Sequence, residues 1–116
     1  MKLNHLNLTV DDVPATRRFL EKHVGLRPYG RGQKNFDVLF DDDDLVLTLI
    51  GAGRSNKVSY PKTFHIGFIQ PSEERVDELN QQLCDDGFDI EPPSRQHGAW
   101  TFYFEAPGGF TVEVLC

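Results

Sequence analysis

The stretch LNHLNLTV, residues 3–10, places a histidine inside what its pattern predicts to be a half-buried strand. Apolar and polar residues alternate strictly, which is the period of a strand with one face in the core. The two faces carry Leu6, Leu8 and Val10 on one side and His5, Asn7 and Thr9 on the other. A polar row along a core strand suits the wall of a binding site if other polar groups of the chain point to the same place.

Composition and charge narrow the class of protein. The chain has 116 residues, of which 39% are hydrophobic and 26% charged, and this is typical of one globular domain with a modest core. A net charge of −6 argues against nucleic acid or an anionic membrane as the main partner and favours a small molecule. No stretch reaches the roughly 20 apolar residues of a membrane span, and the first residues lack the pattern of a signal peptide, so we expect a cytoplasmic protein.

Short charged and thiol-bearing segments carry weaker signals. Cys84 and Cys116 form no C-x-x-C pair, which indicates reduced thiols. The aspartates at 41–44 lack the glycine and distal glutamate of a calcium loop, so we expect a solvated turn. Two basic groups suit either solvated loops or contacts to an anionic substrate: Arg27, Arg31 and Lys34, and Arg54 with Lys57.

The chain repeats one order of elements. In the first half, the strand is followed by a helix that Asp11 or Asp12 caps and Gly25 ends, and then by a hairpin over residues 35–51. After a Gly- and Ser-rich linker at 51–62, a strand over 63–70 precedes a helix over 71–90, which Ser72 caps and which ends near Gly87. Two strands around a Pro-Gly-Gly turn complete the second half, so we predict two copies of strand, helix, then hairpin or three-stranded meander.

Superposing the two halves pairs residues of interest. His5 falls on His65, and Thr48 falls on Glu113. Both histidines and Glu113 point away from the apolar face of their strands, so curved sheets with outer helices would bring the three to one concave side. Two imidazoles and one carboxylate form a facial triad for a divalent metal. A single such histidine is more often a plain cavity residue, but burial of three polar groups together is costly without an ion.

Three segments in this order, NHLNLTV, FHIGF and APGGFTVEVL, resemble the vicinal oxygen chelate superfamily of glyoxalase I, extradiol dioxygenases, fosfomycin transferases and bleomycin-resistance proteins. The resemblance covers the whole chain and implies an α+β fold, in which two βαβββ modules form a cupped, mostly antiparallel sheet with helices on the convex side. It implies a single domain over 1–116, with module one at 1–50 and module two at 63–116. The metal ligands of the family lie where His5, His65 and Glu113 lie here.

The resemblance implies a metal-dependent enzyme, a lyase or dioxygenase, that acts on a small substrate with vicinal oxygens through one divalent Fe, Mn, Ni or Zn ion. Thr48 stands where glyoxalase I has a fourth ligand, which disfavours that chemistry. The alternative is a metal-free binding protein of the bleomycin-resistance type, which sequesters a small molecule in the groove between subunits. Either function implies a homodimer, with or without swapped modules.

Further residues are expected around the metal. Tyr103 and Glu113 are the candidate catalytic residues, with Tyr103 as a hydrogen-bond donor or acid, or as a plain aromatic wall. His97 stands in a polar loop, where it is either a proton carrier or a surface residue. The predicted substrate contacts are Asn7, Thr9, Thr48, Arg95, His97, Thr101 and Tyr103, and Arg54 and Lys57 are further candidates for an anionic substrate tail.

Overall fold

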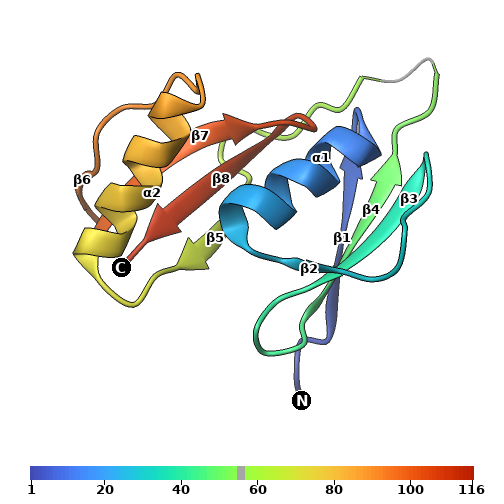
Figure 1. Ribbon diagram of the computed structural model, residues 1–116, viewed down its shortest axis with the longest axis horizontal. Coiled ribbons are helices and arrows are strands. Elements are labelled where there is room, and N and C mark those ends of the chain that lie inside the picture. Colours follow the sequence, from blue (N-terminus) through green and yellow to red (C-terminus); the bar gives the residue numbers. More distant parts are fainter. Residues whose placement is uncertain (55–56) are drawn as a thin grey trace. The chain divides into compact units, whose positions relative to one another are not determined.

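The structure is a computed structural model that describes residues 1–54 and 57–116. The chain separates into two compact units, Met1–Tyr60 with Ala106–Phe110, and Pro61–Glu105 with Thr111–Cys116. Figure 1 labels the helices and strands of both units. The predicted linker at 51–62 includes residues 55 and 56, which lie outside the described part of the chain.

The first unit contains one mixed sheet and one helix. Its elements are β1 (His5–Val10), α1 (Val13–Phe19) with a π-helical turn at Leu20–Val24, β2 (Arg27–Pro28), β3 (Phe36–Phe40) and β4 (Val46–Gly51). The strand order is β1-β4-β3-β2, with β1 parallel to β4 and the other neighbours antiparallel. The side chains of β1 alternate as predicted, since Leu8 and Val10 are buried whereas His5 is exposed.

Local signals explain where α1 begins and ends. Asp12 is the N-cap, because its Oδ1 accepts a hydrogen bond from the backbone N–H of Ala15 at 2.9 Å. Gly25 ends the helical segment with φ at 82°, a left-handed conformation that favours glycine. Both ends confirm the predicted helix, whereas the change from α to π geometry at Leu20 was not predicted.

The four aspartates between β3 and β4 form the predicted turn. Asp41 Oδ1 accepts hydrogen bonds from the backbone N–H groups of Asp43 and Leu45, at 2.9 and 2.8 Å. Asp44 has a φ of 62°, which aspartate tolerates better than most residues. The acidic run therefore closes a hairpin.

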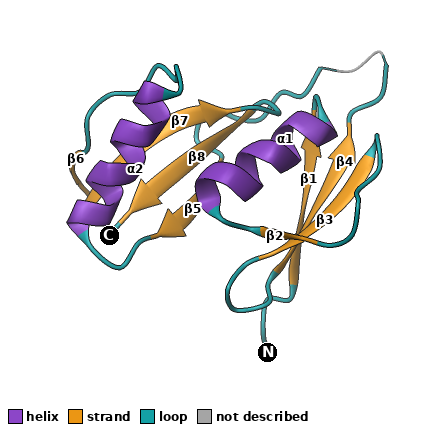
Figure 2. Ribbon diagram, viewed as in Figure 1, coloured by secondary structure: helices purple, strands orange, loops and turns teal. Residues whose placement is uncertain are grey.

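The second unit repeats the order of the first. Its elements are β5 (His65–Ile69), α2 (Glu73–Asp85), β6 (Ser94–Gln96), β7 (Ala99–Ala106) and β8 (Phe110–Leu115). The strand order is β5-β8-β7-β6, with β5 parallel to β8. Ser72 Oγ caps α2 by accepting the backbone N–H of Arg75, and Figure 2 shows α2 lying across one face of its sheet.

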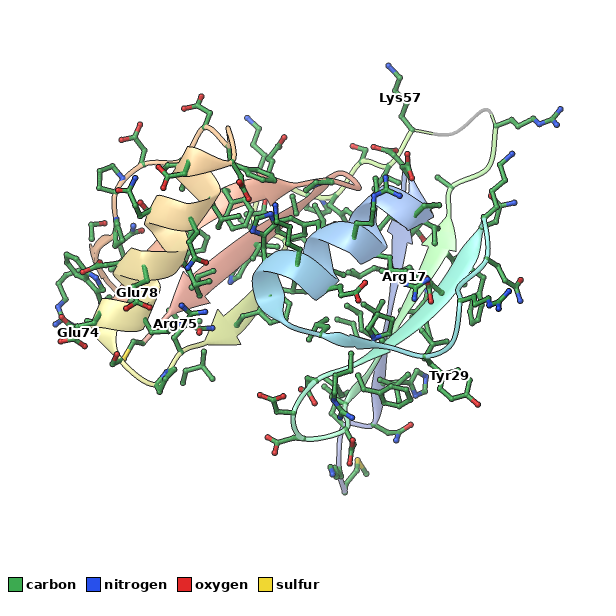
Figure 3. All side chains as sticks on the ribbon, viewed as in Figure 1. Arg17, Tyr29, Lys57, Glu74, Arg75 and Glu78 are labelled. Carbon is green, nitrogen blue, oxygen red and sulfur yellow. The ribbon has the colours of Figure 1, made fainter. Side chains whose placement is uncertain are left out.

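The core of the second unit lies between α2 and β7. The buried face of the helix carries Val76, Leu79 and Leu83, whereas the labelled Glu74, Arg75 and Glu78 extend along its outer side (Figure 3). Phe102 and Phe104 of β7 are buried and stack with ring centroids 5.9 Å apart. Alternation along β7 therefore sends Thr101 and Tyr103 to the sheet face away from the helix.

Strand register confirms the predicted equivalence of the two halves. In the first sheet, His5 pairs with Val46 and Asn7 with Thr48. In the second sheet, His65 pairs with Thr111 and Gly67 with Glu113. Each histidine therefore stands two residues before the position that faces Thr48 or Glu113, and the predicted α+β fold of two βαβββ modules is confirmed.

Across the described residues, none of the helices has the length and apolar character that a membrane crossing requires.

Candidate functional site

The candidate site of the second unit is built around Glu113 of β8. Its side chain is 12% exposed, and its Oε1 accepts hydrogen bonds from the hydroxyls of Tyr103 at 2.6 Å and Thr101 at 2.9 Å. Both donors come from β7. Trp100 and Cys116 exchange two backbone hydrogen bonds of 3.0 Å, and the same antiparallel register brings Tyr103 opposite Glu113.

Thr101 lies beneath the carboxylate. It is completely buried, and its Oγ1 lies 2.9 Å from both Glu113 Oε1 and the backbone oxygen of Val114. One hydroxyl proton serves one of these acceptors at a time. Thr101 was predicted to contact the substrate, and its place in the structure suits support of Glu113 instead.

His65 of β5 approaches the other carboxylate oxygen. Its Nε2 lies 3.3 Å from Glu113 Oε2, and its Nδ1 lies 3.1 Å from the backbone oxygen of Thr63. A carbonyl oxygen only accepts, so Nδ1 carries a proton. In the neutral imidazole, Nε2 then presents a lone pair to a carboxylate oxygen, and two acceptors in contact require a proton or a cation between them.

The space beside Oε2 is kept open by Gly67. Glycine 67 pairs with Glu113 across the β5–β8 ladder, and a Cβ built on it would lie 3.6 Å from Glu113 Oε2. A larger side chain at this position would extend over the carboxylate. The glycine therefore leaves room for a ligand of Oε2.

Tyr103 is held as a hydrogen-bond donor. The hydrogen bond to Glu113 raises the pKa of Tyr103 to about 12, with further contributions from burial and from the negative charge of Glu113. Its ring also meets that of His65 edge to face, with centroids 5.5 Å apart. Tyr103 is therefore protonated at neutral pH, and its proton lies in the hydrogen bond to Glu113.

In the first unit, His5 repeats part of this arrangement. Its Nδ1 lies 3.2 Å from Asn4 Oδ1, and Nε2 of this exposed side chain has no hydrogen-bond partner among the residues that the structure describes. Thr48 stands at the position equivalent to Glu113, and its hydroxyl donates to Asn7 Oδ1 at 2.6 Å. The first unit therefore places a hydroxyl–amide pair where the second unit has its carboxylate.

Thr9 lies at the end of the same polar row. Its side chain is exposed, and its backbone N–H and C=O both bond to the Tyr60 hydroxyl, at 3.0 and 2.9 Å. The structure therefore brings Asn7 and Thr48 together, and leaves Thr9 with a backbone contact.

The structure does not bring Arg95 or His97 to Glu113. Arg95 bonds to Glu73 of α2, and its guanidinium lies 5.6 Å from the ring centroid of Trp100, which itself donates to Asp77 of α2. Arg95 therefore lies on the helix side of the second sheet, opposite the face of Glu113. His97 is exposed in the β6–β7 turn with a φ of 51°.

The donor set of the second unit suits a divalent transition metal. Within the described ranges, no group of three or more His, Cys, Asp or Glu side chains forms a metal site. His65 and Glu113 supply one imidazole nitrogen and one carboxylate oxygen. Zinc, iron, nickel and manganese ions all bind these two types of ligand. The Thr63 carbonyl on Nδ1 is the outer partner that metal-binding histidines usually have.

Comparison with known proteins agrees with this architecture. The model of the Glyoxalase/Bleomycin resistance protein/Dioxygenase superfamily matches residues 2–114. The structure of a possible glyoxalase from Bacillus cereus is 56% identical, with a TM-score of 0.90, over 100% of this chain and 99% of that one. None of the curated proteins compared with the chain matches it.

Two more distant structures share the fold. A lactoylglutathione lyase from Agrobacterium tumefaciens is 20% identical, with a TM-score of 0.77, over 98% of this chain and 92% of that one. An integron cassette protein from Vibrio cholerae is 27% identical, with a TM-score of 0.74, over 99% and 94% of the two chains. With the match over residues 2–114, the chain belongs to the glyoxalase, bleomycin-resistance protein and dioxygenase superfamily.

Proposed function

We propose that this protein is a metal-dependent enzyme of the glyoxalase and dioxygenase type, acting on a small substrate with vicinal oxygens. The main supporting observation is that His65 Nε2 lies 3.3 Å from Glu113 Oε2. The other polar atoms of the two side chains, His65 Nδ1 and Glu113 Oε1, are already held by hydrogen bonds. His65 and Glu113 are two of the proposed ligands. His5 is the third, supported by its equivalent position in β1 and by its Nε2, which is unpartnered within residues 1–54 and 57–116.

The residues around Glu113 have distinct roles in this proposal. A divalent Fe, Mn, Ni or Zn ion, when bound, supplies Lewis-acid activation of two neighbouring substrate oxygens. Thr101 and Tyr103 hold Oε1, which directs Oε2 outward. Tyr103 keeps its proton until about pH 12, so it acts as a hydrogen-bond donor and not as a base. Asn7 and Thr48 are proposed to bind substrate oxygens, since both groups carry exposed polar atoms.

Metal binding and turnover test the proposal together. Chelator-treated protein is titrated with Zn²⁺, Ni²⁺, Mn²⁺ and anaerobic Fe²⁺, and then screened with vicinal diols and α-hydroxycarbonyls with and without oxygen. We expect binding and turnover in the parent and loss of both in His5→Ala, His65→Ala and Glu113→Gln. Variants that bind metal as tightly as the parent would refute the ligand set.

The assembly is also part of the proposal, as a homodimer. His5 comes either from the same chain as His65 and Glu113 or from the partner. Mixing His5→Ala with His65→Ala protein distinguishes the two cases: a module-swapped dimer regains about one metal site in four, whereas an unswapped dimer regains none.

One observation favours a second candidate, a binding protein of the bleomycin-resistance type. Phe36 and Ile50 pair across β3 and β4 and are 41% and 42% exposed, on the same sheet face as Thr48. Exposed apolar side chains beside polar ones suit the binding of a bulky, partly apolar ligand. Calorimetry of metal-free protein with a bulky cationic drug tests this function, since the net charge of −6 attracts a cation. Tight binding without metal would favour it over the enzyme.

A further inference from the structure

Basic side chains gather in the first unit at a place that the proposed metal site does not use. Two adjoining hollows lie beside α1, with volumes of about 500 and 530 Å³. Pro14, Arg18 and Lys34 line both of them. Arg31 adds a cation to the first hollow. Arg54 adds one to the second, which is also lined by Asp11 and Asp12, two carboxylates that each accept a backbone N–H. These volumes are within the range of small-molecule sites.

The charge balance of the first hollow is positive. Four cationic side chains and two carboxylates line it. Arg17 and Asp37 form an ion pair with each other, because Arg17 Nε lies 3.3 Å from the nearly buried Asp37. Arg18, Arg31 and Lys34 then face Glu21 alone. Their side chains have no ion pair with any residue in the described part of the chain. In a protein with a net charge of −6, such a local excess focuses anions.

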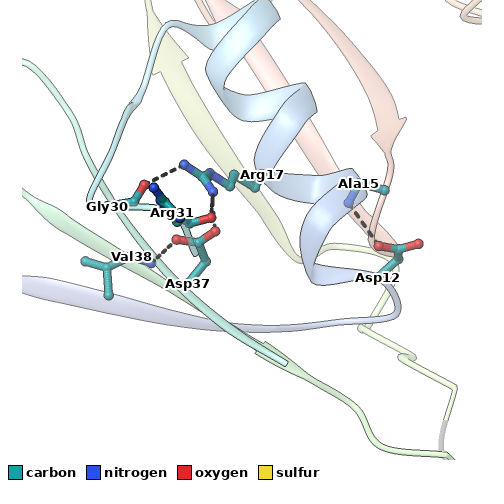
Figure 4. A network of polar contacts seen from close by, with 7 residues as sticks. All are labelled: Asp12, Ala15, Arg17, Gly30, Arg31, Asp37 and Val38. Carbon is teal, nitrogen blue, oxygen red and sulfur yellow. Dashed lines mark hydrogen bonds and ion pairs between the residues drawn. The ribbon is translucent and has the colours of Figure 1, made fainter. Parts of the chain in front are cut away.

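The loop that carries Arg31 and Lys34 is held in place before any ligand arrives. Arg17 donates to the backbone oxygens of Gly30 and Arg31, as Figure 4 shows. Further along, Gln33 N–H bonds to the Phe36 oxygen at 3.0 Å, and Gly51 N–H bonds to the Asn35 oxygen at 2.9 Å.

Glycine 32 allows the loop to come this close. It has a φ of 73°, and a Cβ on it would clash with the Asp37 carboxylate and the Arg17 guanidinium. A loop fixed at several points loses less conformational entropy when its cations bind a ligand.

We propose that these hollows bind a small molecule that carries a diphosphate group. The first hollow receives one phosphate between Arg18, Arg31 and Lys34, because arginine and lysine are the usual phosphate-binding side chains. The shared Arg18 and Lys34 allow the second phosphate, or the organic part, to extend toward Arg54. The limited size of the hollows favours a small ligand over a nucleic-acid backbone, which needs a longer basic track.

Inorganic pyrophosphate is the probe. Binding to chelator-treated protein is measured by calorimetry at low salt, with His65→Ala tested in parallel, because pyrophosphate also chelates metals. We expect saturable binding that weakens with added salt, with the same affinity in His65→Ala. Arg18→Gln and Lys34→Gln should each weaken it about fivefold, and the double variant about 20-fold. Lys62→Gln, the matched control outside the hollows, should change it less than about twofold.

Three results of the calorimetry would overturn the diphosphate proposal. Pyrophosphate that fails to saturate, that binds Arg18→Gln/Lys34→Gln as tightly as the parent, or that binds through His65 would overturn the proposal. Amide chemical shifts provide a second reading without mutation. Changes centred on residues 31–34 support the site, and changes confined to residues 63–67 and 111–115 contradict it. Failure of the metal proposal would leave all of these readings unaffected.

Discussion

Each unit contains one carboxylate in a largely enclosed position, and their surroundings differ. Asp37 in β3 is 2% exposed at its side chain and is paired with Arg17, while its Oδ1 accepts the Val38 N–H at 2.8 Å. Glu113 in β8 is 12% exposed and meets two hydroxyls and His65. A guanidinium is permanently charged, whereas an imidazole is charged only when protonated. The charge of Asp37 is therefore balanced within the fold, and that of Glu113 remains available to a cation.

Position on the sheet explains the difference. Asp37 pairs with the fully buried Leu49, so it points to the helix side of the first sheet, where Arg17 of α1 reaches it (Figure 4). Glu113 pairs with Gly67 and points to the face away from α2. The contrast supports a structural role for Asp37 and is consistent with the proposed metal-binding role of Glu113. Four predictions follow this contrast from the largest effect to the smallest.

Removal of Asp37 should affect stability and leave metal binding intact. Asp37→Ala leaves the Arg17 guanidinium largely buried without its counter-charge, which should lower the free energy of unfolding by about 3 kcal/mol. Urea denaturation measures this loss. Asp42→Ala, in the exposed turn, is the control with an expected change within about 0.5 kcal/mol. If Asp37→Ala also abolished metal binding in folded protein, the separation of roles would fail.

Thr101→Val should affect stability and metal affinity together. It removes a buried hydroxyl that serves Glu113 and Val114, so we expect a loss of about 1.5 kcal/mol in stability. Loss of an outer partner of a ligand should weaken metal binding about tenfold. Thr48→Val is the matched change in the first unit, and it should leave metal affinity within about twofold of the parent. Equal effects of the two variants would argue against the special role of Glu113.

The pKa of Tyr103 tests its bond to Glu113. The folded value of about 12 lies above the ordinary 10.0, so the bond stabilises the fold fully below pH 10 and this contribution is lost as pH rises through 12. NMR titration of ring-labelled tyrosine, assigned with Tyr103→Phe, should detect it. Glu113→Gln should bring the pKa back toward 10.0. Tyr103→Phe should cost about 1 kcal/mol at neutral pH. A Tyr103 pKa that is the same in Glu113→Gln as in the parent would contradict the hydrogen bond.

The smallest expected effect is at the start of α2. Backbone hydrogen bonding, followed by the Ser72 side chain, lowers the pKa of Glu74 below 4.5. A lowered folded pKa stabilises the protein above the ordinary value, and the contribution is lost as pH falls through the folded value. Glu74→Gln should therefore lower the melting temperature slightly at pH 7 and not at pH 2. An equal shift at both pH values would point to a cause other than charge.

Much of the fold was predictable because its signals are local. Alternation along residues 3–10 placed His5 on the polar face, and Ser72 and Gly25 marked helix ends through capping chemistry that acts within one turn. The short β2 and β6 strands carry too few residues for a periodic signal. The Arg17–Asp37 pair joins a helix to a strand, and no sequence pattern encodes that contact. Alternation along FDVLF would instead place Phe36, Val38 and Phe40 on the buried face, whereas the structure buries Asp37 and Leu39.

The candidate site was predictable only in part. The repeat pointed to His65 and Glu113, because equivalent positions in two modules are visible in the sequence. The Thr63 carbonyl on His65 was missed, since main-chain acceptors leave no residue signature, and so was the space beside Glu113 that Gly67 provides. The face of Arg95 depended on its contacts to Glu73 and Trp100, which lie in other elements.

The central claim is that His65 and Glu113 hold a metal. The direct test is elemental analysis of protein purified without a histidine tag or chelator, beside His65→Ala and the matched His97→Ala. The proposal predicts about one transition-metal ion per chain in the parent and in His97→Ala, and none in His65→Ala. Absence of metal from all three proteins, with none taken up on titration, would contradict it, as would His65→Ala protein that retains the full amount.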